Sequence, residues 1–315
     1  MSKKLEDLSQ INEELSGALN LLQERLGELP VKESTHGNIV EETASLLQRC
    51  ADVVGEEKKE KPLIRVIHHL ACSGGTLITK CIASLPNTFV LNEVHPNTGM
   101  FPPRGKPIFL PTDFISQLKY SKFPNTEILA IEIFKSAIDI ILNDVNSCGG
   151  HLVIREHTHS EYCFGKEINN SRLIKNSLSV DYDVRSLLTV RHPLDSYSSL
   201  VKNGWVHFMP DSFDEYCRRY LKFIEDYDKS KIIKYENFTS SPKSVMQEIC
   251  NELMLPYTDA FDSTFSSIEL SGDSGRTSGQ IRIKASDRAE KVVEEAKSSN
   301  NYKLIIERLG YEKDF

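Results

Sequence analysis

The feature that most constrains the fold is a regular alternation of short apolar runs and helical patterns, which begins at Pro62. Short runs rich in β-branched residues predict strands, and apolar residues spaced three and four apart predict helices. Because strands that alternate with helices form parallel sheets covered on both faces, we expect an α/β fold with a central parallel sheet flanked by helices. The predicted strands span 63–68, 88–92, 127–132, 151–156, 185–190 and 231–234, and the predicted helices include 76–85, 193–202, 212–227 and 241–253.

Two of the predicted strands run into turns that suit an anion. The first strand is followed by Cys72-Ser73-Gly74-Gly75-Thr76, where a helical pattern begins. Backbone amides at the start of such a helix point toward a bound phosphate. The strand at 185–190 runs into Arg191, and Pro193 fits the first turn of the next helix, where a missing N–H costs nothing. Ligands of open α/β sheets bind at the carboxyl ends of strands, so both turns are candidates for one site.

The composition limits the partners of the protein. Its 315 residues carry a formal net charge of −7 with 39% hydrophobic residues, which suits a large core but not a general nucleic-acid binder. The sequence has no run of about 18 apolar residues, so no transmembrane segment is predicted. Residues 1–7 lack the apolar core of a signal peptide, so we expect a cytoplasmic protein. Reduced thiols are expected, because the cysteines form no C-x-x-C pair.

Residues 1–60 differ from the rest and predict a helical arm, which precedes an α/β domain over residues 61–315. Apolar residues repeat with a heptad period over residues 5–29, as in a coiled coil that would make a homo-oligomer. Asn12 in this seam would fix the register of a parallel coiled coil. The alternative is an antiparallel helical hairpin that packs on its own domain. The seam consists of Leu5, Asn12, Leu19 and Leu26 at one heptad position and Leu8, Leu15, Leu22 and Leu29 at the other.

The glycine-containing turn differs from the phosphate loop of nucleotide-dependent kinases. That loop needs the pattern G-x-x-x-x-G-K-[ST], whose lysine reaches the terminal phosphates, and no lysine follows the glycines here. The segment Cys72-Ser73-Gly74-Gly75-Thr76 instead resembles the 5′-phosphosulfate loop of PAPS-dependent sulfotransferases. Members of this family share a P-loop-type α/β fold and transfer a sulfuryl group from PAPS, 3′-phosphoadenosine 5′-phosphosulfate. The resemblance implies PAPS as cofactor, PAP (adenosine 3′,5′-diphosphate) as product, and no required metal.

Further motifs follow in the order that the family shows. Arg191 and Ser199, eight residues apart, match the arginine and serine that bind the 3′-phosphate of PAPS in that family. The alternative is an ordinary helix pair between Arg191 and Asp195 with a solvated serine. The segment 232–238 resembles the tyrosine-acid-Asx strand end of the family, which implies that Tyr235 borders the adenine.

The segment 271–278 resembles the flexible phosphate-capping loop of the family, with Gly275 in the loop and Arg276 as the anion contact. A plain surface loop is the alternative, because glycine and serine also dominate ordinary turns. This segment completes the cofactor-binding residues that the resemblance implies, which are Cys72, Ser73, Gly74, Gly75, Thr76, Leu77, Arg191, Ser199, Tyr235, Gly275 and Arg276.

Sulfuryl transfer also needs a base that takes a proton from the acceptor. The strand at 151–156 is followed by His157 and resembles the basic-x-His strand end of the family, which implies that His157 is the general base. Histidine titrates near neutrality, so it accepts a proton at working pH without special tuning. Glu93 follows the second strand, where some carbohydrate sulfotransferases place a catalytic glutamate, so it is the competing base. A hydrogen-bonded core histidine is the structural alternative for His157.

The chain departs from the family at two positions. Cys72 stands where the loop lysine usually sits, and Leu77 stands where cytosolic members often have an adenine-stacking tryptophan. The missing positive charge could come from Arg155, Lys80, Arg104 or His69. Adjacent residues of a strand face opposite sides, so we do not expect a metal at His68-His69, near which no matching ligand cluster is predicted.

These observations predict a sulfotransferase that acts on a hydroxyl or amine of a carbohydrate, glycolipid or small-metabolite acceptor. A nucleotide-dependent kinase is one alternative, and the absent loop lysine distinguishes it. A non-catalytic scaffold that binds PAPS or PAP is another, which the missing lysine and the helical arm would suit.

Overall fold

The computed structural model describes residues 61–98, 100, 112–121, 123–168, 172–270, 280, 281 and 287–312. The arm predicted over residues 1–60, with its seam over residues 5–29, lies outside the described residues. The same holds for Arg104, Gly275 and Arg276.

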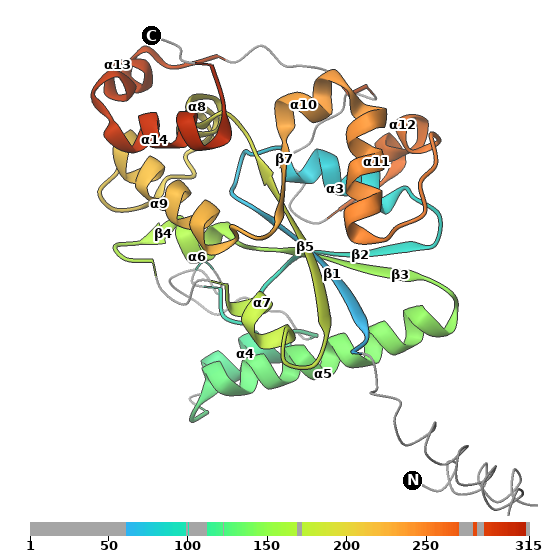
Figure 1. Cartoon of the computed structure of the whole chain (residues 1–315). Coiled ribbons are helices and arrows are strands. Elements are labelled where there is room, and N and C mark those ends of the chain that lie inside the picture. The colour runs from blue at the N-terminus through green and yellow to red at the C-terminus, as the bar shows by residue number, and fades with distance from the viewer. Residues whose placement is uncertain are drawn as a thin grey trace, which may run out of the picture. The chain divides into compact units, whose positions relative to one another are not determined.

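A parallel sheet of five strands forms the centre of the α/β domain, in the spatial order β2-β3-β1-β5-β7 (Figure 1). Parallel pairing joins β1 to β3 and β5, β2 to β3, and β5 to β7. Each strand lies within two residues of a predicted strand at both ends, so the predicted fold class is confirmed. The strands are β1 (Leu63–His69), β2 (Thr88–Val94), β3 (His151–Glu156), β5 (Asp183–Val190) and β7 (Lys231–Lys234).

The strand predicted at 127–132 is wrong, because this segment begins the long helix α5 (Thr126–Ser147). The apolar run at its start resembles a strand when read alone. Its buried residues recur every three to four positions, which is the period of a helix with one apolar face. They are Ala130, Phe134, Ile138, Leu142 and Val145. Ile128 and Ile140, by contrast, are exposed on this helix.

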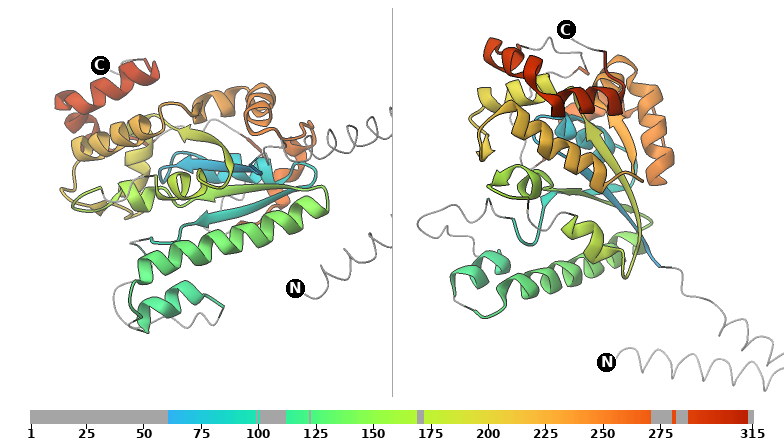
Figure 2. Two further views of the ribbon diagram at one scale, coloured as in Figure 1. Left: turned by 60° about the horizontal axis from the view of Figure 1, so that its bottom comes forward. Right: turned by 60° about the vertical axis from the view of Figure 1, so that its left-hand side comes forward.

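Helices cover both faces of the sheet (Figures 1 and 2). On one face α3 (Gly75–Ala83) and α11 (Pro242–Leu253) pack in the same buried cluster as Ile67 of β1. On the other face α5 and α7 (Leu173–Leu178) pack with Ile64 and Val66. Alternate residues of β1 therefore enter different cores, which explains why this strand is apolar throughout.

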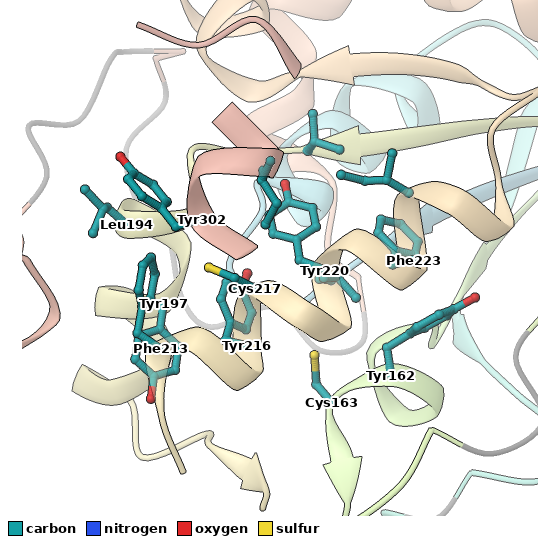
Figure 3. Packing of buried hydrophobic residues seen from close by; sticks show 14 of the residues in the cluster. Tyr162, Cys163, Leu194, Tyr197, Phe213, Tyr216, Cys217, Tyr220, Phe223 and Tyr302 are labelled. Atoms are coloured by element: carbon teal, nitrogen blue, oxygen red, sulfur yellow. The ribbon is translucent and has the colours of Figure 1, made fainter. Parts of the chain in front are cut away.

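A third buried cluster, rich in aromatic side chains, joins the end of β5 to the short helix α6 (His159–Tyr162) and to four longer helices (Figure 3). The longer helices are α8 (Pro193–Lys202), α9 (Phe213–Asp226), α13 (Glu290–Ser298) and α14 (Asn300–Leu309). The cluster holds the C-terminal helices against the helix that follows Arg191. The other described elements are α4 (Phe114–Tyr120), α10 (Tyr235–Ser240), α12 (Phe261–Thr264), a 3-10 turn at Phe265–Ser267, and the paired short strands β4 (Phe164–Gly165) and β6 (His207–Phe208). Within the described residues, no helix is both long and apolar enough to cross a membrane.

The strand order changes direction at β1. The chain passes from β1 to β2 and β3 on one side, and then to β5 and β7 on the other. Open parallel sheets bind ligands at such a switch point, outside the carboxyl ends of the strands. The register pairs His69 of β1 with Thr189 of β5, so the turns that follow these two strands leave the sheet side by side.

Candidate active site

The turn after β1, residues 70–76, forms a tight loop that leads into α3; we call it the glycine loop. Cys72 and Gly74 have positive φ angles of 63° and 87°. The Ser73 hydroxyl donates to the Leu70 carbonyl at 2.7 Å, which closes the turn from inside. No side chain caps the N-terminus of α3, and its first-turn amides are of the kind that bind phosphate.

Neighbouring side chains leave no room for a Cβ at either glycine of the loop. A Cβ at Gly74 would lie 2.2 Å from Cδ2 of Tyr235. A Cβ at Gly75 would lie 2.8 Å from the ring of His69. The loop backbone therefore packs directly on Tyr235, from the end of β7, and on His69, from the end of β1. This packing brings residues far apart in the sequence to one end of the sheet.

Arg191 joins the glycine loop to α8. Its Nη1 donates to the carbonyl oxygen of Cys72 at 3.2 Å and to Oγ of Ser199 at 3.4 Å. Its guanidinium lies 5.1 Å from the ring centroid of Tyr235. The structure thus brings Cys72, Gly74, Arg191, Ser199 and Tyr235 together, and we call this group the anion corner.

The anion corner has unused hydrogen-bonding capacity. Nε of Arg191 is buried and has no hydrogen-bond partner among the described residues. A buried donor without a partner costs roughly 1–3 kcal/mol, so such groups point to a ligand that completes them. An arginine and a neighbouring hydroxyl suit a phosphate group.

The ordinary helix pair between Arg191 and Asp195 is not how these residues are engaged. Asp195 forms an ion pair with Arg288, with 2.6 Å between Oδ1 and Nε. Ser199 is not a solvated serine, because its hydroxyl donates to the Asp195 carbonyl at 2.8 Å and accepts from Arg191. The carboxylate that could neutralise Arg191 is thus paired with a different cation.

A second group of polar side chains, the histidine cluster, gathers around Glu93 at the ends of β2 and β3. Glu93 has a positive φ of 56° and lies where the register between β2 and β3 shifts. A bulge of this kind redirects a side chain, and bulges occur often beside active sites. Oε1 of Glu93 lies 2.7 Å from Nη2 of Arg155 and 3.2 Å from Nε2 of His69, and Oε2 lies 3.7 Å from Nε2 of His157. His159 packs edge-on against His157, with ring centroids 4.1 Å apart.

Burial keeps the histidines of this cluster neutral. It lowers the pKa of His157 to about 4, although the charge of Glu93 acts in the opposite direction. Burial also lowers the pKa of His69 and of His159. For Glu93, burial alone would raise the pKa, but the hydrogen bond with His69 and the charge of Arg155 outweigh it and hold the pKa below its usual range. The cluster therefore combines an ionised carboxylate, an arginine and neutral imidazoles.

Side chains that could bind a metal ion do lie near His68-His69. The prediction that no cluster of metal ligands lies there is therefore wrong. His69, Glu93 and His159 each place one potential ligand atom within 4.8 Å of the others. The register shift that turns Glu93 toward β1 brings them together, and it cannot be read from the sequence. Arg155 also contacts the nitrogens of His69, at 2.6 Å from Nε2. A guanidinium in this position repels a metal ion, so the group suits an ion-pair network better than a metal site.

A second group of this kind, His95, Glu156 and Glu161, is buried. The backbone N–H of Asn97 donates to Nδ1 of His95 at 3.0 Å, which leaves the proton of the neutral ring on Nε2. That nitrogen donates to Oε1 of Glu161 at 3.0 Å. Hydrogen bonds thus engage both ring nitrogens of His95 and account for this group.

The remaining predicted residues have different surroundings. Leu77, one of the predicted cofactor-binding residues, is buried in the cluster that α3 shares with α11. Lys80 is 8% exposed, one turn further along α3. Thr76 is half-buried at the start of this helix. Gly275 and Arg276 lie outside the described residues, so their predicted role in capping a phosphate stays a prediction.

Sequence reasoning did not single out His159 or Arg288. His159 lies two residues after His157, and this spacing was a usable signal. Arg288 follows no motif, and only the fold brings it to Asp195.

Comparisons with known proteins give a structural likeness without a sequence match. No protein-family model matches the chain, and no curated protein matches it in sequence. A sulfotransferase domain from the curacin biosynthetic pathway is similar with a TM-score of 0.48 and 15% identity, over 81% of this chain and 99% of that one. The sulfotransferase domain of the Synechococcus PCC 7002 olefin synthase follows with 0.45 and 14%, over 82% and 98%. A mouse sulfotransferase complexed with PAP matches with 0.37 and 11%, over 78% and 88%.

Proposed function

We propose that this chain is a PAPS-dependent sulfotransferase that transfers a sulfuryl group to a hydroxyl or amine of a carbohydrate, glycolipid or small metabolite. The observation that carries the proposal is the anion corner. Four sequence motifs that resemble the donor-binding segments of the family begin at positions 72, 191, 232 and 271, and residues from the first three meet in this corner.

The residues present fit the donor. The first-turn amides of α3 would hold the 5′-phosphosulfate, and Arg191 with Ser199 would hold the 3′-phosphate. The buried Nε of Arg191 would gain a partner there. When bound, PAPS supplies the activated sulfuryl group, and the protein's own residues position it, deprotonate the acceptor and compensate charge.

Arg155 is our candidate for the positive charge that the missing loop lysine would provide, and His69, whose ring is neutral, joins it to the loop. His69 packs on Gly75 at the start of α3, and Arg155 contacts His69. Arg155 is permanently charged and 3% exposed, so its field is poorly screened by water. Glu93 holds this guanidinium from the other side.

His157 is our candidate for the general base. Glu93 is already engaged by Arg155 and His69, whereas His157 is neutral and lies at the edge of the cluster. The N–H at Nε2 of His157 would face Glu93, so Nδ1 would be free of a proton and would accept one from the acceptor. The acceptor group would lie where Thr98 Oγ1 lies, 3.3 Å from Nδ1. Glu93 then orients the imidazole and stabilises its protonated form.

The decisive experiment is transfer of sulfur-35 from labelled PAPS to a mixed pool of carbohydrate, glycolipid and small-metabolite acceptors. We expect labelled product from the wild-type chain, together with tight binding of PAP and weak binding of AMP and ATP in calorimetry. Tight PAP binding without any transfer would indicate a donor-binding scaffold. Preferential binding of ATP would indicate a kinase and overturn the proposal.

A further inference from the structure

Residues 288–311, in the C-terminal part of the described chain, contact residues that lie close in sequence to Tyr235 and Arg191 of the anion corner. Their contacts reach residues on both sides of Tyr235 and residues just after Arg191. Arg191 and Tyr235 come from different strand ends, so the geometry of the corner depends on how α8 and α10 are held relative to each other.

Glu236 links these two helix starts to the C-terminal segment. Its Oε1 accepts the backbone N–H of His192 at 2.8 Å, and its Oε2 accepts the hydroxyl of Tyr311 at 3.0 Å. His192 directly follows Arg191, and Glu236 directly follows Tyr235. One carboxylate therefore fixes the start of α10 against the start of α8, and Tyr311 holds that carboxylate in place.

Two further contacts fix Tyr311 itself. Nζ of Lys234 donates to the carbonyl of Gly310 at 3.2 Å and lies 4.6 Å from the ring centroid of Tyr311. The ring of His192 packs edge-on against Tyr311, with centroids 5.0 Å apart. The ring of Tyr311 thus contacts residues from both sides of the anion corner.

Arg288 makes the second attachment. Its Nε pairs with Oδ1 of Asp195 at 2.6 Å, and its Nη2 lies 3.5 Å from Nδ1 of His192. The Asp195 carboxylate is only 14% exposed, so this ion pair is better shielded than a surface pair. The backbone carbonyl of Asp195 accepts the Ser199 hydroxyl, so Arg288 holds the turn of α8 that presents Ser199.

We propose that residues 288–311 act as a strap that positions the anion corner for a 3′-phosphorylated nucleotide, with Tyr311 and Arg288 as positioning residues. This inference rests on the proposed function. The helices α13 and α14 give the strap its rigidity, because they are packed into the aromatic cluster with α8 and α9. Neither residue needs to touch the ligand for the strap to work.

The strap makes a prediction about ligand preference. PAP would contact both sides of the corner, whereas AMP lacks the phosphate that Arg191 and Ser199 would hold. A shift of α8 relative to α10 should therefore lower the affinity for PAP and leave the affinity for AMP nearly unchanged. We expect Tyr311→Phe to lower the affinity for PAP by about tenfold in calorimetry and that for AMP by less than about twofold. Arg288→Ala should act in the same way, and Arg288→Lys, which keeps a cation for Asp195, should recover part of the loss.

Two variants serve as matched controls. Tyr257→Phe also removes a tyrosine hydroxyl that donates to a carboxylate, in this case the exposed contact with Asp259. Arg308→Ala also removes an arginine ion pair, in this case the one between α14 and Glu225 of α9. Both should leave the PAP and AMP affinities unchanged, and thermal unfolding of each variant verifies that it is folded.

Equal losses for PAP and AMP, or no loss for PAP, would overturn the strap and leave the proposed function standing. A wild-type chain that does not prefer PAP to AMP would overturn the proposed function, and the strap with it.

Discussion

At the scale of single residues, Arg191 is the side chain that we expect to discriminate PAP from AMP. Replacing it by alanine removes a charge-assisted contact to the 3′-phosphate, which costs about 1.5–3 kcal/mol, or roughly ten- to a hundredfold in affinity. We predict that Arg191→Ala binds PAP and AMP almost equally in calorimetry. Arg185→Ala is the matched control, because it removes an exposed arginine from β5, the strand that ends just before Arg191. Retention of the PAP preference in Arg191→Ala would refute this role.

The turnover of His157→Ala and of Glu93→Gln distinguishes the two candidate bases. A base acts only in the transition state, so His157→Ala should lower turnover by about 10²–10⁴ while PAP affinity survives. Glu93→Gln should lower turnover less, because in our proposal it orients His157 and holds Arg155. Near-normal turnover in His157→Ala with an inactive Glu93→Gln would reverse the two roles.

The pH profile tests the environment of His157 as well as its role. An unperturbed histidine would give an acid-side fall in rate at about pH 6–7. Since burial lowers the pKa of His157 to about 4 and the base must be neutral, the rate should stay constant down to about pH 5 and fall as the pH passes through about 4. The measurement is kcat against pH for wild type and His157→Ala. A fall near pH 6–7 that vanishes in the variant would show that His157 is more solvated during turnover.

Some of these residues could be predicted from the sequence, and others could not. The turn Arg191-His192-Pro193 and the serine at 199 lie within one strand-turn-helix unit, so local spacing was enough to place them together. Arg288 meets Asp195 only through the packing of α13 on α8, which no local pattern encodes. The lowered pKa of His157 likewise arises from burial, which depends on the fold.

At the scale of elements, the glycine loop depends on a close approach between its backbone and Tyr235. We predict that Gly74→Ala lowers PAP affinity by about tenfold or more, because a Cβ there meets the Tyr235 ring and the overpacking moves the loop. Gly149→Ala is the matched control, since Gly149 also has a positive φ but has no neighbour within 4 Å of an added Cβ. Both variants should lose similar stability from backbone strain, and only Gly74→Ala should lose PAP affinity. Equal PAP binding by the two would show that the loop tolerates the methyl group.

The ends of helices and strands could be predicted from the sequence where a turn residue marks them. Helix α8 spans the predicted residues 193–202, because Pro193 can only begin a helix of this kind. The first turn of α5 gave the wrong prediction because its apolar residues crowd together, and the helical period shows only over the whole 22 residues. A short apolar run is ambiguous until its length is considered.

At the scale of the whole molecule, the predicted seam over residues 5–29 raises the question of oligomeric state. If it is intermolecular, deleting residues 1–30 should convert an oligomer to a monomer and leave PAP affinity nearly unchanged, because the anion corner is built from residues 72–235. Light scattering of the full-length and shortened chains measures the mass. An unchanged mass would assign the seam to packing within one subunit.

The pairing of β1 with β5 joins position 63 to position 183, and the corner above it also needs Tyr235 from the end of β7. Contacts between positions so distant in the chain form slowly, since a long loop must close before they can stabilise anything. During synthesis, the glycine loop leaves the ribosome long before the arginine, the tyrosine and the C-terminal segment that complete its surroundings. In our proposal, the nucleotide site is therefore complete only when nearly the whole domain has been made, and binding of PAP would report that the domain has folded.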